Sequence, residues 1–357
     1  MANGSSGSTA AGAYLDFEKP IAKLEIQIEE LELSQRQQAE TGRDFSEEIK
    51  QLRANQVSLL RKTYSNLSAW EVVQVARHQN RPVVVDYIDM IVNDFRELHG
   101  DRRFRDDRAI VTGLGRIRGR KLMIIGNNKG RLLKEKVACN FGCAHPEGYR
   151  KALRAMQLAQ KYHLPVVSLI DTSGAYPGIG SEERSVAQSI AENLSVMSRL
   201  RVPVVCVVIG EGGSGGALGI GVGDRIAMLE HAYYSVIPPE GCAAILWKSG
   251  EHAKQASLAL KPTAKALQKL GIIDEIIPEP LGGAHRDHAQ AGQNVENYIH
   301  QTMNHLARAG IDRLLERRYQ KLRVIGSLSD GSIKEAKAAK KVAKKRKARP
   351  RARTAKS

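Results

Sequence analysis

The sequence lacks long hydrophobic runs. No apolar stretch among its 357 residues approaches the roughly 18 residues that a membrane-spanning helix needs. The N-terminus also lacks the basic start, apolar stretch and small-residue cleavage site of a signal peptide. These absences argue against a membrane-bound or exported protein, and they predict a cytoplasmic location without membrane contact.

Cysteine is also scarce. The chain has four cysteines, which lie in or beside apolar segments without paired C-x-x-C spacing: Cys139, Cys143, Cys206 and Cys242. That pattern excludes a zinc ribbon. We therefore expect reduced, mostly structural thiols and no bound metal ion.

Acidic residues are almost absent from the C-terminal end. Residues 334–357 hold twelve Lys or Arg against the single acid Glu335, which accounts for +11 of the net charge of +17. The rest of the chain is only mildly basic. Because this segment has almost no large apolar side chains, we expect residues 326–357 to form a disordered basic tail. Such a tail either binds a polyanion such as RNA through counterion release or serves only solubility.

The N-terminal region predicts disorder followed by two helices. Residues 1–14 are rich in Gly, Ser and Ala and are expected to be disordered. Apolar residues then recur at three- and four-residue spacing on both sides of a break at Thr41-Gly42: Ile21, Leu24, Ile28 and Leu31, then Phe45, Ile49, Leu52 and Leu59. This spacing predicts an antiparallel helical hairpin over residues 15–64. Such a seam is usually structural, but a protruding hairpin also suits contact with a partner subunit.

The next segment predicts a helix and then two strands. Asp86 can cap the helix, whose apolar face would comprise Ile88, Ile91, Val92, Phe95 and Leu98. Strands are predicted over residues 109–114 and 122–125. The turn after the second strand carries Lys129 and Arg131 beside glycines. It is either an exposed basic turn or a place where an anionic substrate meets two cations.

Two later apolar runs each end in a glycine-rich loop. Residues 165–170 lead into the loop 171–178, and residues 203–209 lead into the loop 210–217. Runs rich in Val and Ile without polar alternation predict strands of a parallel sheet that are buried on both faces. Glycines let the main chain approach a ligand, and a helix that begins there directs free N–H groups outward. The pattern therefore predicts a site that stabilises negative charge with backbone donors.

Two short motifs in the second loop leave other functions open. Residues 210–215 match G-x-G-x-x-G, with Glu230 at the spacing of a ribose contact, which would indicate a nucleotide site. Residues 212–216 match G-x-S-x-G, which in hydrolases carries a nucleophilic serine. Here that serine would be Ser214, and the histidines that follow it are His231, His252 and His285. The same glycines would serve an oxyanion site without any nucleophile.

Longer motifs in a fixed order indicate a family. Residues 171–178, 210–218, 234–237, 239–242 and 245–248 strongly resemble motifs of the alpha subunits of bacterial and plastid acetyl-coenzyme A carboxylase carboxyltransferase. The resemblance extends over roughly residues 15–325. It implies an α/β fold of the crotonase-like type, a spiral of repeated ββα units, over residues 65–325 after the helical hairpin.

The resemblance also implies a reaction and partners. Members of the family transfer a carboxyl group from carboxybiotin, tethered to a carrier protein, to acetyl-coenzyme A, which gives malonyl-coenzyme A in the first committed step of fatty acid synthesis. No cofactor is expected to be bound in this chain itself. The implied partners are a carboxyltransferase beta subunit in an alpha2beta2 assembly, a biotin carboxyl carrier protein and a biotin carboxylase.

Site residues follow from the matched motifs. The resemblance assigns the biotin oxyanion site to Gly215, Gly216 and Ala217. It assigns the facing wall of the pocket to Gly174 and Ala175, and substrate binding to these two residues together with Tyr176 and Gly213. The turn at the exit of a buried strand makes Lys129 and Arg131 candidates for contact with a coenzyme A phosphate.

Three alternatives remain beside this assignment. One is an acyl-coenzyme A hydratase of the same fold, which would need carboxylates in the pocket, and Glu211 and Glu240 are the nearby candidates. The second is the serine hydrolase that uses Ser214. The third is a scaffold that serves only assembly.

Overall fold

The computed structural model describes residues 14–37 and 44–327. The disorder predicted for residues 1–14 and 326–357 therefore falls almost entirely outside the described residues. The chain divides into two compact units, residues 1–318 and residues 319–357. The second unit is described only to residue 327, and it contains the end of helix α14 (Ile311–Val324). Among the described helices, none combines the length and hydropathy that a membrane span requires.

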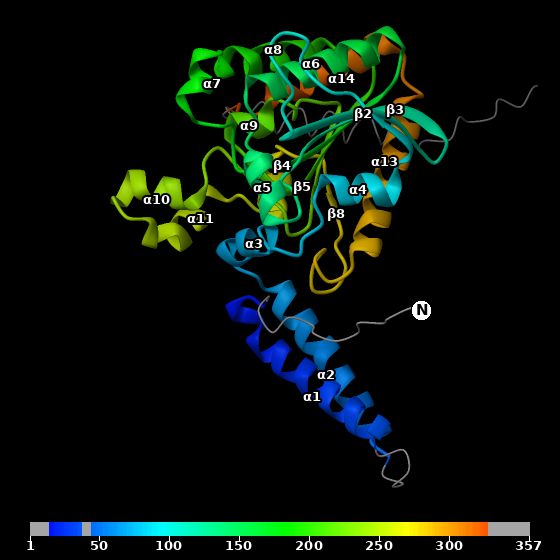
Figure 1. Ribbon diagram of the computed structural model, residues 1–357, viewed down its shortest axis with the longest axis vertical. Helices are drawn as coiled ribbons and strands as arrows, with labels where there is room; N and C mark the ends of the chain where they lie inside the picture. Colours follow the sequence, from blue (N-terminus) through cyan, green and yellow to red (C-terminus); the bar gives the residue numbers. More distant parts are fainter. Residues whose placement is uncertain (1–13, 38–43, 328–357) are drawn as a thin grey trace, which may run out of the picture. The chain divides into compact units, whose positions relative to one another are not determined.

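The two predicted N-terminal helices are present. A short 3-10 helix, η1 (Asp16–Glu18), leads into α1 (Lys19–Gln37), and α2 (Ser46–Ser65) returns alongside it (Figure 1). Side chains bridge the two helices at successive levels, with Arg53 Nη2 2.6 Å from Glu32 Oε1 and Gln56 Nε2 2.7 Å from Glu25 Oε1. The helices therefore pack antiparallel, as their spacing of apolar residues predicts.

The base of this hairpin is attached to the rest of the unit by a buried cluster. Tyr64 packs there with Ile21, Leu60 and Val75, which lies in α3 (Ala69–Ala76). The Tyr64 hydroxyl donates to Oε1 of the buried Glu18 over 2.6 Å. The apolar contacts and the buried hydrogen bond together fix where the hairpin begins.

An eight-stranded mixed sheet forms the centre of the first unit. Its strands are β1 (Asn93–Glu97), β2 (Ile110–Ile117), β3 (Arg120–Asn127), β4 (Val166–Thr172), β5 (Val204–Gly213), β6 (Arg225–Leu229), β7 (Tyr233–Ser235) and β8 (Glu275–Ile277). The order is β1-β2-β3-β4-β5-β6-β8, and β7 pairs with the end of β5. The first three strands are antiparallel, whereas β3, β4, β5, β6 and β8 run parallel. All ten residues of β5 are buried, which agrees with its unbroken apolar sequence.

Strand β1 shows that one predicted helix was too long. Helix α4 (Val84–Ile91) ends before Phe95, which belongs to β1 and not to the apolar face of that helix. The Phe95 ring lies over Gly113 of β2, where a Cβ atom would be only 2.4 Å from the ring. The missing side chain of Gly113 thus makes room for the edge strand. This contact joins distant residues, so the local apolar spacing could not reveal it.

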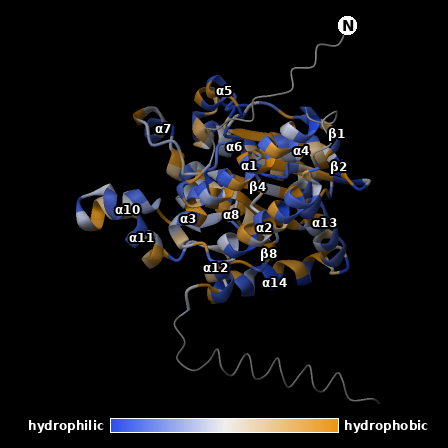
Figure 2. Cartoon of the chain, turned by 90° about the horizontal axis from the view of Figure 1, so that it is seen from below, coloured by the Kyte–Doolittle hydropathy of each residue, from blue (hydrophilic) through white to orange (hydrophobic). Residues whose placement is uncertain are grey.

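Helices pack against the sheet along its length. Helix α6 (Pro146–Lys161) contacts β2 and β3 and lies beside α8 (Val186–Arg199), while α4 contacts β4, and α13 (His288–Leu306) contacts α4, β5 and β8 (Figure 1). The helices carry both hydrophobic and hydrophilic residues along their length, as amphipathic helices over a sheet do (Figure 2). The remaining described helices are α5 (Leu133–Ala138), η2 (Asn140–Gly142), α7 (Ile179–Glu183), α9 (Ser214–Leu218), α10 (Pro239–Trp247), η3 (Gly250–His252), α11 (Ala253–Leu260) and α12 (Ala264–Leu270).

A fully buried arginine closes the end of α8. Arg318 reaches Asp224 with two nitrogens, at 2.8 Å from Oδ1 and 2.7 Å from Oδ2. It also donates to the carbonyl oxygens of Met197, Leu200 and Val202 at 2.8 to 2.9 Å. These carbonyls lie in the last turn of α8 and just beyond it, where a helix has no partners of its own. One guanidinium therefore satisfies a helix end and a buried carboxylate together.

Candidate functional site

The carboxyl ends of three parallel strands meet at one edge of the sheet. Gly126 of β3 pairs with Leu169 of β4, and Thr172 of β4 pairs with Gly212 of β5. The turn after β3 and the two glycine-rich loops after β4 and β5 therefore lie together, as the sequence predicts. This edge is where α/β sheets commonly bind ligands.

The two glycine-rich loops contact each other through their backbones. A Cβ atom on Gly213 would lie 2.0 Å from the carbonyl oxygen of Ser173. One on Gly216 would lie 2.3 Å from the carbonyl carbon of Gly174 and 2.5 Å from the Ala175 nitrogen. No real side chain tolerates such distances, so Gly213 and Gly216 permit an approach that other residues would prevent. The structure thus brings together the loops that the sequence singles out.

Gly174 and Gly215 differ from these two glycines because they have free space. A Cβ atom on Gly174 would meet no described atom within 4 Å, and one on Gly215 would meet only Ile190 Cδ1 at 3.7 Å. The Cα atom of Gly174 therefore borders a space that the described residues leave open, and that of Gly215 has room for a methyl group. A ligand in the space beside Gly174 can approach the backbone there.

Helix α9 begins directly at the second loop. Gly215, Gly216 and Ala217 lie in its first turn, where backbone N–H groups have no acceptor inside the helix. Behind the helix, the buried Asn193 amide donates to the carbonyl oxygen of Gly219 over 2.8 Å, which holds this short helix in place. The arrangement offers fixed, uncharged donors of the kind that stabilise an oxyanion.

Ser214 occupies a strained position at the start of α9, directly after β5. Its φ of 51° lies in the left-handed region that non-glycine residues rarely adopt. In the part of the chain that the structure describes, no hydrogen bond joins its hydroxyl to a histidine. His231 lies beside Glu279, with Nδ1 3.3 Å from Oε2, and His285 lies beside Glu18 at 3.7 Å. The strain fits an elbow in the backbone, but the base that a nucleophilic serine needs is not in place.

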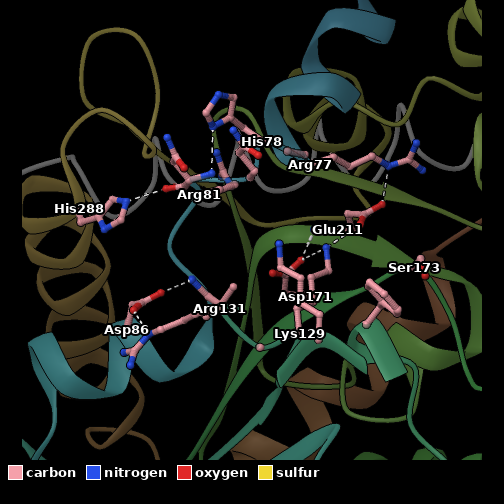
Figure 3. A pocket seen from close by; sticks show the side chains of 17 residues that line it. Arg77, His78, Arg81, Asp86, Lys129, Arg131, Asp171, Ser173, Glu211 and His288 are labelled. Atoms are coloured by element: carbon pink, nitrogen blue, oxygen red, sulfur yellow. Dashed lines mark hydrogen bonds and ion pairs between the residues drawn. The ribbon is translucent and has the colours of Figure 1, made fainter. Parts of the chain in front are cut away.

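A buried network of charges lies at the ends of β3, β4 and β5 (Figure 3). Lys129 Nζ is 2.7 Å from Asp171 Oδ1 and 2.5 Å from Glu211 Oε1. On the other side of Glu211, its Oε2 accepts from Arg77 Nε and from the Tyr233 hydroxyl, both at 2.6 Å. Sequence reasoning gave Lys129 a different partner and missed Arg77, Asp171 and Tyr233 as part of the site. Asp171 is the first residue of the matched motif 171–178, whereas Arg77 and Tyr233 carry no local signal.

The protonation states of this network follow from its contacts. Burial of the Glu211 carboxyl opposes ionisation, but Lys129 and Arg77 outweigh it and lower the pKa of Glu211 to about 2. Burial likewise opposes the charge on Lys129, and its two carboxylate partners still raise the pKa of the ammonium group. Glu211 and Lys129 are therefore both charged at neutral pH.

The two cations predicted to meet a substrate phosphate both have partners within the chain. Lys129 is mostly buried between Asp171 and Glu211. Arg131 is half exposed and reaches Asp86 at 2.5 Å and Asp89 at 2.6 Å. Both cations line a cavity of about 410 Å³ together with Arg77, Arg81, Ser173 and Glu211 (Figure 3). The cavity borders the first loop at Ser173.

Tyr176 lies in the first loop and is partly buried. Its backbone N–H donates to the Ala144 carbonyl over 3.0 Å, and its ring packs on His145 with 4.3 Å between ring centroids. The His145 ring is in turn 2.8 Å from the Ser181 hydroxyl. Tyr176 is therefore held by its neighbours rather than free to swing.

One group in the described residues has the composition of a metal site. Glu18, His78 and His285 place possible ligand atoms within 4.8 Å of one another. The two imidazoles, however, stack with centroids 4.0 Å apart and 28° between planes, so their in-plane lone pairs do not converge. Arg286 also lies 3.4 Å from Glu18 Oε1 and supplies the positive charge there. This geometry fits an ion-pair cluster better than a cation site.

Comparisons with known proteins agree on one family. A family model described as acetyl co-enzyme A carboxylase carboxyltransferase-like matches residues 14–326. An acetyl-coenzyme A carboxylase carboxyl transferase subunit alpha from Rhodopirellula baltica is 54% identical over 316 residues, which cover 88% of this chain and 98% of the relative. The same subunit from Vibrio campbellii is 54% identical over 309 residues, with 87% and 97% covered.

A solved structure shares the fold. The beta subunit of geranyl-CoA carboxylase from P. aeruginosa matches with a TM-score of 0.50 and 17% identity, over 71% of this chain and 45% of that longer chain. The crotonase-like fold implied by the sequence resemblance is confirmed. At this identity the likeness concerns the fold alone.

Proposed function

Because the chain belongs to the acetyl co-enzyme A carboxylase carboxyltransferase family, we propose that it works as the alpha chain of a two-chain enzyme that moves a carboxyl group from carboxybiotin to acetyl-coenzyme A. Its relatives are carboxyl transferase subunits over nearly their whole length, and the chain is accordingly an enzyme chain of the transferase class. The observation that best supports the proposal is the backbone contact between the two glycine-rich loops.

The reaction needs oxyanion donors more than it needs acids and bases. Loss of carbon dioxide from N1 of biotin leaves negative charge on the ureido oxygen, and removal of a methyl proton from acetyl-coenzyme A leaves an enolate oxygen. Backbone N–H groups stabilise such oxygens without titrating and without reorganising. The biotin anion can take the methyl proton itself, so no side-chain base is required. A site built from glycine loops suits this chemistry.

We assign the donors to the biotin side of the reaction. The N–H groups of Gly215, Gly216 and Ala217 in the first turn of α9 would hold the ureido oxygen. Gly174, with its open space, would border the bound ring together with Ala175. Gly213 and Tyr176 belong to the same pocket in this proposal, Gly213 as the contact between loops and Tyr176 at the rim.

The phosphate contacts proposed for Lys129 and Arg131 need an exchange of partners. Each cation already forms ion pairs with acidic side chains of the chain, so a phosphate would have to compete with these carboxylates. Arg131 is the better candidate, because it is half exposed and its interactions with Asp86 and Asp89 are at the surface.

The hydratase alternative is disfavoured by the state of its carboxylates. Glu211 is ionised, with a pKa lowered to about 2, and it accepts bonds from Lys129, Arg77 and Tyr233. Glu240 is held by Arg77 at 2.5 Å. Neither group is poised to deliver a proton to an enoyl substrate.

The proposed partners determine the decisive experiment. We propose a beta chain in an alpha2beta2 assembly, with carboxybiotin brought by a biotin carboxyl carrier protein that a biotin carboxylase charges, all in the cytoplasm. The chain is purified alone and with the beta chain of its native host, and decarboxylation of malonyl-coenzyme A in the presence of biotin is measured. We expect activity only for the pair. Hydration of an enoyl-coenzyme A or ester hydrolysis by the chain alone would overturn the proposal, and no activity in the pair would leave the scaffold alternative.

Replacement of Ser214 by alanine is expected to leave most of the carboxyl transfer activity of the pair intact. Ser214 shapes the turn at positive φ, and a nucleophile would lose nearly all of its rate on such a truncation. The measurement is the malonyl-coenzyme A assay on the assembled variant. Complete loss of activity, together with an acyl adduct on the unmodified protein by mass spectrometry, would support the serine hydrolase instead.

Shortening the N-terminal hairpin is expected to weaken association with the beta chain and spare the fold. Residues 30–53 are replaced by a short glycine linker, which keeps the buried base around Tyr64 and Glu18. Size-exclusion chromatography of the shortened chain with its partner measures assembly, and circular dichroism controls for folding. An unchanged complex would remove the hairpin from the interface.

The C-terminal tail lies outside the described residues. Binding of a polyanion such as RNA by this segment rests on its composition and stays a prediction.

A further inference from the structure

Regular strand pairing stops where the site begins. Ile170 of β4 pairs with Val208 of β5, but the next pair is Thr172 with Gly212. Three residues of β5, 209–211, therefore face the single residue Asp171. Such bulges redirect the chain that follows them, and they often lie beside active sites. Here the chain that follows is the rest of the glycine-rich loop 210–217.

At this bulge, side chains supply the hydrogen bonds that regular pairing between β4 and β5 would otherwise provide. Asp171 Oδ1 accepts from the Glu211 backbone N–H over 2.8 Å. Its carboxylate fills the space beside Gly210, where a Cβ atom would lie 2.5 Å from the same oxygen. Arg81 Nε donates to the Ile209 carbonyl over 2.8 Å. The course of β5 at the site thus depends on side chains from other segments.

Lys129 joins all three strand ends at this point. It follows β3, and its ammonium group contacts both Asp171 at the end of β4 and Glu211 in β5. Its side chain is 17% exposed, and those of the two acids are 5% and 9% exposed. Water therefore screens these contacts poorly, and removal of Lys129 takes away one of the two cations that contact the buried acids.

Arg77 holds the other side of Glu211. It comes from the end of α3 and contacts Glu211, the Tyr233 hydroxyl at 3.0 Å and Glu240 at 2.5 Å. Tyr233 lies in β7, directly opposite Glu211 in the pairing with β5. Glu240 lies in the first turn of α10. Arg77 therefore connects the bulge in β5 with β7 and with the first turn of α10.

We propose that Lys129 and Arg77 are positioning residues of the carboxyl transfer reaction: by holding Glu211 they set the distance between the two glycine-rich loops, 171–178 and 210–217. The inference rests on the proposed function, since it concerns the same site. It gives Lys129 a role through Glu211 rather than through a substrate phosphate. The donors of α9 begin only four residues after Glu211, so a displaced bulge displaces them too.

The test compares Lys129→Met and Arg77→Met in the assembled pair. We expect kcat for malonyl-coenzyme A decarboxylation to fall about 10- to 100-fold, the usual effect of misplacing reacting groups by about 1 Å. KM for malonyl-coenzyme A should stay within about twofold. Arg77→Lys should recover part of the loss, because it keeps a cation beside Glu211. Lys151→Met is the matched control, since Lys151 is a fully buried lysine paired with Asp106, and its loss should leave kcat unchanged.

A double variant distinguishes a loss of activity caused by misplaced loops from one caused by lower stability. Lys129→Met/Glu211→Gln removes the excess buried negative charge that Lys129→Met leaves. The melting temperature should therefore recover, while kcat should not. Recovery of kcat together with stability would overturn the positioning role.

Three other outcomes would decide between the positioning role and its alternatives. An effect of Lys129→Met confined to KM, and absent with malonyl-3′-dephospho-coenzyme A, would make Lys129 a phosphate contact and refute the inference. If either methionine variant fails to assemble, Arg77→Lys and Lys129→Arg take its place, and an unaltered kcat in both would refute it as well. An inactive unmodified pair would instead refute the proposed function, which keeps the two failures distinct.

Discussion

Valine in place of Gly216 is expected to lower the rate of carboxyl transfer by about two to three orders of magnitude while the complex still assembles. The sequence suggests that a side chain there would intrude on the ligand, but the structure gives a different cause. The new Cβ atom would lie 2.3 Å from the carbonyl carbon of Gly174, so the two loops must separate. Their separation moves the N–H groups of α9 away from the oxygen that they stabilise.

Gly215→Ala is the matched control for this prediction. It changes the neighbouring residue of the same helix turn, but its Cβ atom would contact only Ile190 at an ordinary 3.7 Å. The free protein should tolerate it. The malonyl-coenzyme A assay on both assembled variants gives the comparison. Near-normal turnover of Gly216→Val would mean that the contact between the loops does not matter for the reaction. A loss in Gly215→Ala alone would show that the ligand fills the space beside Gly215.

Methionine in place of Arg318 is expected to lower the free energy of unfolding by about 3–5 kcal/mol, because it removes the guanidinium group that faces the buried Asp224 carboxylate. Arg318 is fully buried and supplies five hydrogen bonds, two to Asp224 and three to carbonyl oxygens at the end of α8. Methionine fills a similar volume but donates nothing. Urea denaturation of the full-length chain, followed by circular dichroism, measures the change.

Two controls distinguish the loss of stability that comes from the buried Arg318–Asp224 pair from the effect of losing any arginine. Arg201→Met removes an exposed ion pair with Asp312 and should change stability little. Arg318→Met/Asp224→Asn also removes the carboxylate charge that faced the guanidinium group, and it should cost less than the sum of its single variants. A small loss in Arg318→Met, comparable to that of Arg201→Met, would contradict the role assigned to the buried pair.

The sequence predicted those parts of the site that depend on local pattern. The strands β4 and β5 appear as apolar runs, and their glycine-rich ends lie together because parallel strands end at one edge. The roles of Gly213 and Gly216 could not be separated from those of Gly174 and Gly215 by sequence alone. All four are glycines beside the same site, and only the facing backbone shows which of them lack room for a side chain.

The charged network around Glu211 could not be predicted from the sequence, because its members are far apart in the chain. Arg77 and Glu211 are 134 residues apart, and Lys129 and Glu211 are 82 residues apart. Nothing in the local pattern around Arg77 distinguishes it from an exposed helix end. The sequence makes Lys129 a candidate site residue, but a cation at a strand exit attracts a buried carboxylate as readily as a phosphate. Its partner depends on the bulge in β5, which the sequence does not reveal.

The position of Arg318 in the chain has a consequence for synthesis on the ribosome. Arg318 follows Leu200, one of its carbonyl partners, by 118 residues. At about 5–20 residues per second, roughly 6–24 s pass before the ribosome adds Arg318 after Leu200. During that interval the end of α8 and Asp224 lack their guanidinium partner. A nascent chain arrested before residue 318 should therefore be digested by protease near residues 197–202, and one arrested after the C-terminal helix has emerged should resist.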